Sequence, residues 1–219
     1  MKPRIVILSA PSGGGKTTIS EALRARRKDI GYSVSATTRQ PRPGEVDGKA
    51  YHFVSPAEFD RMIRAGEFLE WAEYAGNRYG TLKREVDGIL SSGRHALLDI
   101  EVQGANLVLK KTEGNRPICI FILPPSGRGW IERLRGRETE SPESLAQRAQ
   151  WAIKEIQQAT GWEQIIINDH LERAVGEVSK VIDEGGTVIH RPSIQDLNRL
   201  VQDMMAEATR TKHENQEPR

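Results

Sequence analysis

Short apolar runs alternate with amphipathic segments along the chain. Apolar runs of this kind are typical of parallel strands that are buried on both faces of a sheet. They lie at residues 4–9, 32–35, 96–100, 118–123 and 165–167. Helical patterns separate the runs, and this alternation predicts an α/β fold with a doubly wound parallel sheet. In such a sheet the ligand lies beyond the carboxyl ends of the strands.

The predicted helices have recognisable starts and apolar stripes. We expect them at 16–27, 102–111, 130–158, 169–183 and 194–208, and Ser141-Pro142 predicts the start of a second helix within 130–158. Asp169 and Glu172 predict a capping box. The last segment carries an apolar stripe at helical spacing, and the polar residues after 208 predict a frayed end.

The region between residues 37 and 90 breaks this alternation. Its Pro- and Gly-rich start predicts a binding loop, and Ser55-Pro56 followed by Glu58 predicts a helix start. The expected elements, in order, are a loop at 37–49, a strand at 51–54, a helix to Arg64 closed by Gly66, a strand at 68–74, a turn at 77–81 and a helix at 83–90. Together they predict a small inserted α+β lobe.

A glycine-rich segment connects the first strand to the first helix. It comprises Ala10, Pro11, Ser12, Gly13, Gly14, Gly15, Lys16, Thr17 and Thr18. Glycines let successive backbone N–H groups turn towards phosphate oxygens, and the helix N-terminus favours the negative charge. Lys16 would reach the outer phosphates and Thr17 would offer its hydroxyl to Mg²⁺. Ala10 stands where the first glycine is usual. The alternative to a phosphate-binding loop is a glycine-rich turn between strand and helix, followed by a surface lysine.

Composition narrows the classes of function. With 219 residues, 37% hydrophobic and 28% charged, the chain reads as one soluble domain over 1–219. The formal net charge of +2 gives no sign of nucleic-acid binding, and no apolar stretch reaches membrane-spanning length. The single cysteine, Cys119, predicts a buried thiol and no internal disulfide. Met1 leads almost directly into the first strand, so we expect no signal peptide and a cytoplasmic location.

Several stretches resemble signatures of the guanylate kinase family, in order and spacing. They are 33–45 with 48–53, 77–81, 98–105, 124–126, Gly136-Arg137 with Arg148 downstream, and 167–169. The resemblance covers roughly residues 4–189. It implies that ATP and GMP, and also dGMP, are the substrates and that ADP and GDP are the products. It also implies a core (4–33, 85–125 and 158–190), a GMP-binding lobe (34–84) and a helical lid (126–157), followed by a C-terminal helix and tail (191–219).

The resemblance assigns the ATP side and the catalytic groups. Besides the glycine-rich segment, it implies that lid arginines close onto the ATP phosphates, that Asp99 orients a Mg²⁺-bound water and that Asn168 lies near the adenine. The catalytic residues are expected to be Lys16, Arg39, Asp99, Arg133, Arg137 and Arg148. Two alternatives stay open: Asp99 could cap a helix, and the arginines could pair with glutamates of their own helices, with Arg135 competing for the role of Arg133.

The same resemblance assigns the GMP side. Two guanidinium groups and two phenols can hold a monophosphate, and a carboxylate suits guanine because N1–H and the 2-amino group lie side by side. The expected GMP-binding residues are Ser35, Arg39, Arg42, Tyr51, Glu70, Tyr79, Thr81 and Glu101. Thr81 and Glu101 stand where serine and aspartate are usual. The alternatives are that the arginines are solvated, that Tyr51 is a plain strand residue and that Glu70 is a surface carboxylate.

Two other functions remain open. One is a guanylate-kinase-like interaction module that has lost catalysis, and the other is a small-metabolite kinase on the same fold. The intact Gly-Lys-Thr sequence argues against the first, and the Arg39, Arg42, Tyr51 and Tyr79 set argues against the second. We expect no nucleic acid or membrane partner, and either a monomer or a homo-oligomer.

Overall fold

The computed structural model describes residues 2–74, 76–112, 116–135, 142–159, 161–187 and 192–214, except for the side chains of 135, 142–149, 208 and 211–214. The chain divides into two compact units. The first comprises Met1–Ile7 with Arg24–Ile118, and the second comprises Leu8–Leu23 with Cys119–Arg219.

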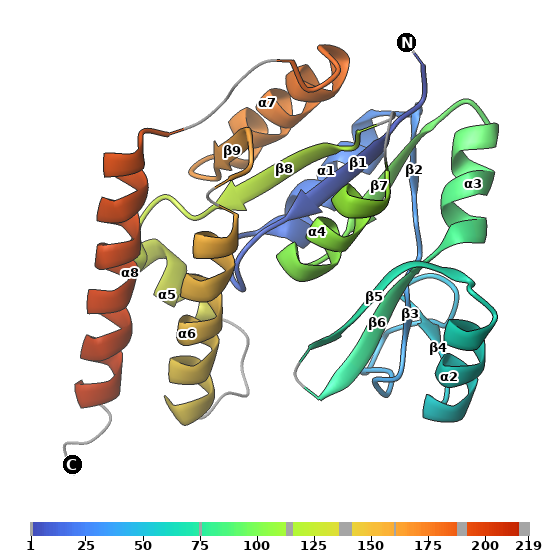
Figure 1. Ribbon diagram of the computed structural model, residues 1–219. Helices are drawn as coiled ribbons and strands as arrows, with labels where there is room; N and C mark the ends of the chain where they lie inside the picture. The colour runs from blue at the N-terminus through green and yellow to red at the C-terminus, as the bar shows by residue number, and fades with distance from the viewer. Residues whose placement is uncertain are drawn as a thin grey trace. The chain divides into compact units, whose positions relative to one another are not determined.

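A five-stranded sheet has the strand order β2-β7-β1-β8-β9 (Figure 1). Its strands are β1 (Ile5–Ser9), β2 (Ile30–Tyr32), β7 (His95–Asp99), β8 (Ile118–Leu123) and β9 (Gln164–Ile167). The β2–β7 and β8–β9 pairs are parallel. Every residue of β1 is buried, as expected for a strand covered on both faces. The order 2-7-1-8-9 requires crossovers, which helices supply, and the predicted α/β fold is confirmed.

Four helices follow strands of this sheet or lead back to it. They are α1 (Lys16–Arg26), α3 (Lys83–Ser91), α4 (Val102–Lys111) and α7 (Leu171–Asp183). The predicted bounds of α1 and α4 agree with these to within one residue. Helix α7 buries an apolar stripe that includes Val175, Val178 and Ile182, at the spacing of one helix face.

A second sheet, in the first unit, has the order β4-β3-β6-β5. It consists of β3 (Ala36–Thr37), β4 (His52–Phe53), β5 (Phe68–Tyr74) and β6 (Asn77–Leu82). The β3–β4 pair is parallel, whereas β3–β6 and β5–β6 are antiparallel. Helix α2 (Pro56–Arg64) packs Phe59 and Met62 into the core of this sheet. The Phe59 and Phe68 rings stack with centroids 4.5 Å apart.

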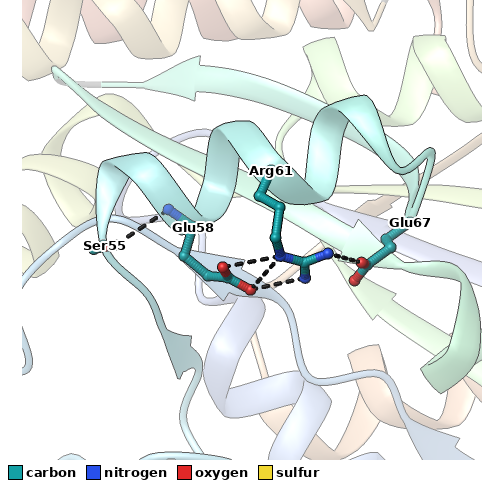
Figure 2. Close-up of polar contacts among 4 residues, drawn as sticks. All are labelled: Ser55, Glu58, Arg61 and Glu67. Atoms are coloured by element: carbon teal, nitrogen blue, oxygen red, sulfur yellow. Dashed lines mark hydrogen bonds and ion pairs between the residues drawn. The ribbon is translucent and has the colours of Figure 1, made fainter.

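Helix α2 begins and ends where the sequence predicts. Figure 2 shows the start, where the Ser55 hydroxyl accepts a hydrogen bond of 3.1 Å from the Glu58 backbone N–H. Pro56 occupies the first turn, and Gly66 follows the end with φ +67°, a conformation that favours glycine. The Arg61 guanidinium lies between the carboxylates of Glu58 and Glu67, 2.8 Å from each.

Two predictions in this region are wrong. The segment 77–81 is not a turn but most of strand β6, because Tyr79 and Thr81 pair with β5 and the reversal falls beside Gly76, whose φ is +74°. The strand predicted at 32–35 ends earlier, at Tyr32, and the chain enters the second sheet at Ala36. Ser35 is therefore not a strand end of the five-stranded sheet.

Three further expectations need correction. The N-cap of α7 is His170, without a side-chain capping bond, because the Asp169 carboxylate accepts from the His170 N–H and pairs with Arg173. Helix α8 (Ile194–Glu214) runs six residues past the predicted end, so the residues up to Glu214 are helical and not frayed. Cys119 is partly exposed rather than buried.

The second unit also contains α5 (Gly127–Arg135) and α6 (Pro142–Gln158). Helix α8 packs against both of them, and Figure 1 shows the three helices side by side. The predicted break into two helices near Ser141-Pro142 is confirmed by the start of α6. None of the helices in the described part of the chain has the length and apolar character needed to cross a membrane.

Candidate functional site

The glycine-rich segment of the second unit has the backbone conformation of a phosphate-binding loop. Gly13 and Gly15 have φ values of +82° and +92°, which side chains rarely adopt. The Gly14 N–H donates to the Pro11 carbonyl at 2.8 Å, and α1 begins directly after Gly15. The first turn of α1 contains no acidic residue, so its N-terminus can attract an anion.

The three glycines also allow close packing around this loop. A Cβ on Gly13 would lie 2.8 Å from the Leu134 Cδ2 atom, and one on Gly14 would lie 2.9 Å from the Ala10 Cβ atom. Ala10, the departure from the usual glycine, is thus a buried methyl that the loop accommodates because Gly14 has no side chain. The simpler interpretation as a turn beside a surface lysine does not explain this packing.

Lys16 is the first residue of α1 and is half-buried, whereas Thr17 and Thr18 are exposed. Asn168 follows β9, is buried and donates from Nδ2 to the Gly14 carbonyl at 3.1 Å. A Cβ on Gly15 would lie only 2.2 Å from that same nitrogen. Asn168 therefore contacts the backbone of the phosphate loop.

Arg133, on α5, also reaches the loop. Its Nη2 donates to the Asn168 carbonyl at 2.9 Å, and its Nη1 lies 3.8 Å from the position of a Cβ on Gly15. Nη1 is buried and has no hydrogen-bond partner among the described residues, an arrangement that an anion in the loop would satisfy. Arg137 lies outside the described residues. Arg148 lies in α6, but its side chain, like that of Arg135, lies outside them too.

Two residues that hold the loop were missed by the sequence analysis. The Trp130 indole, fully buried, donates from Nε1 to the Ser12 carbonyl at 2.7 Å. The Ser12 N–H in turn donates to the Glu155 Oε2 atom at 3.3 Å. The spacing of three between Trp130 and Arg133 places both on one face of α5. This spacing was the sequence signal that could have placed Trp130 beside the loop together with Arg133.

In the first unit, the structure brings Arg39, Tyr51 and Tyr79 together. The Tyr51 and Tyr79 rings meet edge to face with centroids 5.9 Å apart. The Arg39 guanidinium carbon lies 5.4 Å from the Tyr51 ring centroid and 5.7 Å from that of Phe53. Tyr51 is therefore not a plain strand residue, because it forms one wall of a basic and aromatic cluster.

Glu45, the last residue of the stretch 33–45 and not a predicted site residue, organises this cluster. Its Oε1 accepts from Arg39 Nη2 at 2.8 Å and its Oε2 accepts from the Arg42 N–H at 2.7 Å. The carboxylate raises the pKa of Arg39, and the same hydrogen bond lowers the pKa of Glu45. A turn closed by the Glu45 N–H and the Arg42 carbonyl, with Gly44 at φ +84°, brings the carboxylate back onto Arg42. The Arg42 side chain is exposed.

Glu70 is buried, with 3% of its surface exposed, so the interpretation as a surface carboxylate is wrong. Its Oε1 accepts from the Thr81 hydroxyl at 2.6 Å and from the Thr81 N–H at 3.2 Å. Burial raises the pKa of Glu70, although the Thr81 hydrogen bonds act in the opposite direction. Gly104 of α4 allows the carboxylate to approach, because a Cβ there would lie 2.7 Å from Oε2.

The remaining predicted residues lie at the ends of elements in the first unit. Asp99 is the last residue of β7 and is partly buried, and Glu101 is the N-cap of α4 without a side-chain capping bond. Asp99 is therefore not the cap of that helix. Ser35 lies between β2 and β3, where its carbonyl accepts from the His52 N–H at 2.9 Å.

A parallel sheet whose first strand leads through a glycine loop into a helix defines a phosphate-loop nucleotide-binding protein. A family model described as "Guanylate kinase" matches residues 2–185. The chain belongs to the guanylate kinase family.

Individual proteins agree with this assignment. A "Guanylate kinase" of Sphingopyxis alaskensis is 44% identical over 81% of this chain and 80% of its own length. One of Thermobifida fusca is 42% identical over 88% of this chain and 93% of its own. The crystal structure of a guanylate kinase from Anaplasma phagocytophilum is similar, with a TM-score of 0.69 and 30% identity. That match covers 89% of this chain and 93% of that chain.

Proposed function

We propose that this protein transfers the γ-phosphoryl group of ATP to GMP, and also to dGMP, giving ADP and GDP or dGDP. The observation that carries the proposal is the buried Glu70 carboxylate, which lies beside Thr81 in a sheet that also holds the Arg39 cluster. A buried acceptor for two adjacent N–H donors, in the same sheet as a basic phosphate site, suits guanosine monophosphate better than other nucleotides.

On the ATP side, the phosphate loop would cradle the phosphates with its backbone N–H groups, and Lys16 would hold their outer oxygens. Arg133 supports this assignment because its Nη1 is buried beside the loop and finds no hydrogen-bond partner in the part of the chain that the structure describes. Arg137 and Arg148 would join it on the transferring group. Phosphoryl transfer depends on positioning and charge neutralisation, and arginines in this role contribute about 10³- to 10⁵-fold in rate. Asn168 would support the loop and approach the adenine.

The donors beside the loop fit a magnesium ion bound together with ATP. Thr17 is exposed on the first turn of α1 and offers a hard oxygen donor, and a cation that keeps several of its waters needs such an open position. Asp99 would orient one of those waters. Magnesium would supply charge neutralisation on the phosphate oxygens.

On the GMP side, Arg39 and Arg42 would bind the monophosphate, with hydroxyl groups from Tyr51 and Tyr79. Arg39 would also stabilise the charge that develops during transfer. Glu70 would accept from N1–H and the 2-amino group of guanine, and Thr81, Ser35 and Glu101 would complete the base site. AMP offers no such pair of donors, so Glu70 would be left without a partner.

The division into core, GMP-binding lobe (34–84) and lid (126–157) belongs to this proposal. The lid would close over both nucleotides and exclude water, which limits idle hydrolysis of ATP. We propose that the protein binds ATP together with GMP or dGMP and uses Mg²⁺ as its cofactor. We also propose that it acts in the cytoplasm.

A coupled assay of ADP formation tests the function. Purified protein with ATP and Mg²⁺ would be given GMP, dGMP, AMP, UMP or no acceptor. We expect turnover with GMP and dGMP that exceeds turnover with AMP by at least about 10³-fold, because a buried unpaired carboxylate rejects the wrong base. The proposal would be contradicted by equal rates with and without acceptor, or by a preference for another acceptor. The absence of any turnover would favour an inactive interaction module.

Substitution of Glu45 by glutamine is expected to raise the KM for GMP about tenfold and to lower kcat, because Arg39 would also act on the transferring group, while the KM for ATP stays nearly unchanged. The carboxylate orders Arg39 through a charged hydrogen bond of 2.8 Å and holds the backbone of Arg42, and such bonds are worth about 1.5–3 kcal/mol. Steady-state kinetics with each substrate varied in turn measure kcat and the two KM values separately.

Glu58→Gln is the matched control. Glu58 also forms an ion pair of 2.8 Å with an arginine, but its partner is Arg61 on the exposed face of α2 (Figure 2). The control should leave all three kinetic constants within about twofold, since exposed ion pairs contribute little. If the two variants gave the same KM for GMP, Glu45 would have no positioning role.

A further inference from the structure

Helix α8 lies beyond the residues that the guanylate kinase family model matches, which end at 185. It nevertheless packs along α5 and α6 in the second unit (Figure 1). Met204 is fully buried and Leu197 is 5% exposed, so α8 is anchored by apolar contacts at two positions two turns apart. Because these contacts hold α8 in place, α8 can in turn fix the position of α5, against which it packs.

A hydrogen bond joins α8 to the first residue of α5. The Asp203 carboxylate of α8 accepts from the Gly127 N–H at 2.5 Å. The first N–H groups of a helix have no partner within it, and a carboxylate there is favoured by the helix dipole. Ser126 supplies a second cap, because its hydroxyl accepts from the Gly129 N–H at 3.1 Å. The start of α5 is thus capped partly by its own chain neighbour and partly by α8.

The backbones of the two helices also approach closely at this point. A Cβ on Gly127 would lie 2.6 Å from the Asp203 carbonyl carbon and oxygen and 2.7 Å from the Met204 nitrogen. Any side chain at 127 would have to displace α8, because the atoms that it meets are backbone atoms. Gly127 is therefore required by packing rather than by its dihedral angles.

Helix α5 transmits this contact to the phosphate loop. Gly127, Trp130 and Arg133 are spaced by three, so each is a neighbour of the next on the helix surface. Trp130 donates to the Ser12 carbonyl at 2.7 Å, and Arg133 donates to the Asn168 carbonyl at 2.9 Å and leaves Nη1 buried beside Gly15. The first residue of α5 therefore contacts α8, whereas Trp130 and Arg133 contact Ser12 and Asn168 at the loop.

We propose that α8 is a positioning element for the ATP site, and that Asp203, through Gly127, seats α5 so that Trp130 and Arg133 meet the phosphate loop. The inference rests on the proposed function in that the loop binds ATP. Asp203 touches neither substrate and is a positioning residue. Its loss should weaken ATP binding selectively, because both contacts of α5 lie on the loop.

The test compares Asp203→Ala with Asp196→Ala. Asp196 is also an acidic residue of α8, but its hydrogen bonds go to Ser193 at the start of the same helix. We expect Asp203→Ala to raise the KM for ATP about fivefold with the KM for GMP within twofold, and Asp196→Ala to change neither. Asp203→Asn keeps an acceptor oxygen and should restore most of the ATP affinity.

Hydrogen exchange of the α5 amides provides a readout that does not depend on catalysis. Exchange over 128–135 should be faster in Asp203→Ala than in Asp196→Ala, and Gly127→Ala should have a larger effect than either. If wild-type protein failed to phosphorylate GMP, the proposed function would fail while the exchange data still tested the positioning role. Equal exchange in the two aspartate variants, or equal rises in both KM values, would overturn the inference.

Discussion

Gly15→Ala is expected to lower the rate of phosphoryl transfer by about 10²- to 10³-fold while the protein stays folded. At φ +92° an alanine is strained by about 1–2 kcal/mol, and its methyl would lie 2.2 Å from Asn168 Nδ2. The loop or Asn168 must therefore move, and the N–H groups that would cradle the phosphates move with it. ADP formation with saturating GMP measures the loss, and a urea titration measures the folding.

Gly176→Ala is the control for this substitution. Gly176 lies within α7, where a Cβ would meet nothing within 4 Å. Alanine in a helix interior is favoured over glycine by about 1 kcal/mol, so this variant should be slightly more stable and equally active. A Gly15→Ala enzyme within tenfold of wild-type activity would show that the loop conformation is not required.

Glu70→Gln is expected to reduce kcat/KM for GMP by about 10²-fold or more and to reduce the preference for GMP over AMP. Glutamine keeps one acceptor oxygen but presents an NH₂ group where guanine offers donors. Glu73→Gln, on the exposed face of the same strand, is the control and should not change kcat/KM for either GMP or AMP. An unchanged ratio of GMP to AMP activity in Glu70→Gln would remove Glu70 from the guanine site.

The same substitution should alter the pH dependence of stability. Burial raises the pKa of Glu70 above its ordinary value of 4.5, so between that value and the folded-state pKa the native protein holds the proton more tightly than the unfolded chain. The free energy of unfolding therefore falls as pH rises through this window, and the loss is complete above the folded-state pKa. Urea midpoints at pH 4.5 and 7.5 should differ less in Glu70→Gln than in wild type, and an equal difference would contradict the burial argument.

Local patterns were sufficient for most elements. The apolar runs at 118–123 and 165–167 and the helix start at Ser55 depend on residues next to one another, and all three lie where predicted. The segment 77–81 was misassigned because Asn-Arg-Tyr-Gly has turn composition. Only pairing with β5, across the reversal, makes it a strand.

The candidate site residues differ in the same way in how far the sequence predicts them. The glycine loop, Arg39, Tyr51 and Tyr79 could be selected from the sequence, because each carries its chemistry in its residue type and in a recognisable motif. Glu45 stands in the same motif, but the turn that returns its carboxylate to Arg42 appears only in the folded loop.

The sequence by itself determined the α/β class, the phosphate loop and the family, since these depend on short local patterns and on their order along the chain. Only the tertiary structure decided that Trp130 holds Ser12 and that Asp203 caps α5. These contacts join residues 118 and 76 positions apart, and no local pattern records which donor meets which acceptor once the helices pack. Burial of Glu70 is of the same kind, because Gly104 of a distant helix makes the space for its carboxylate.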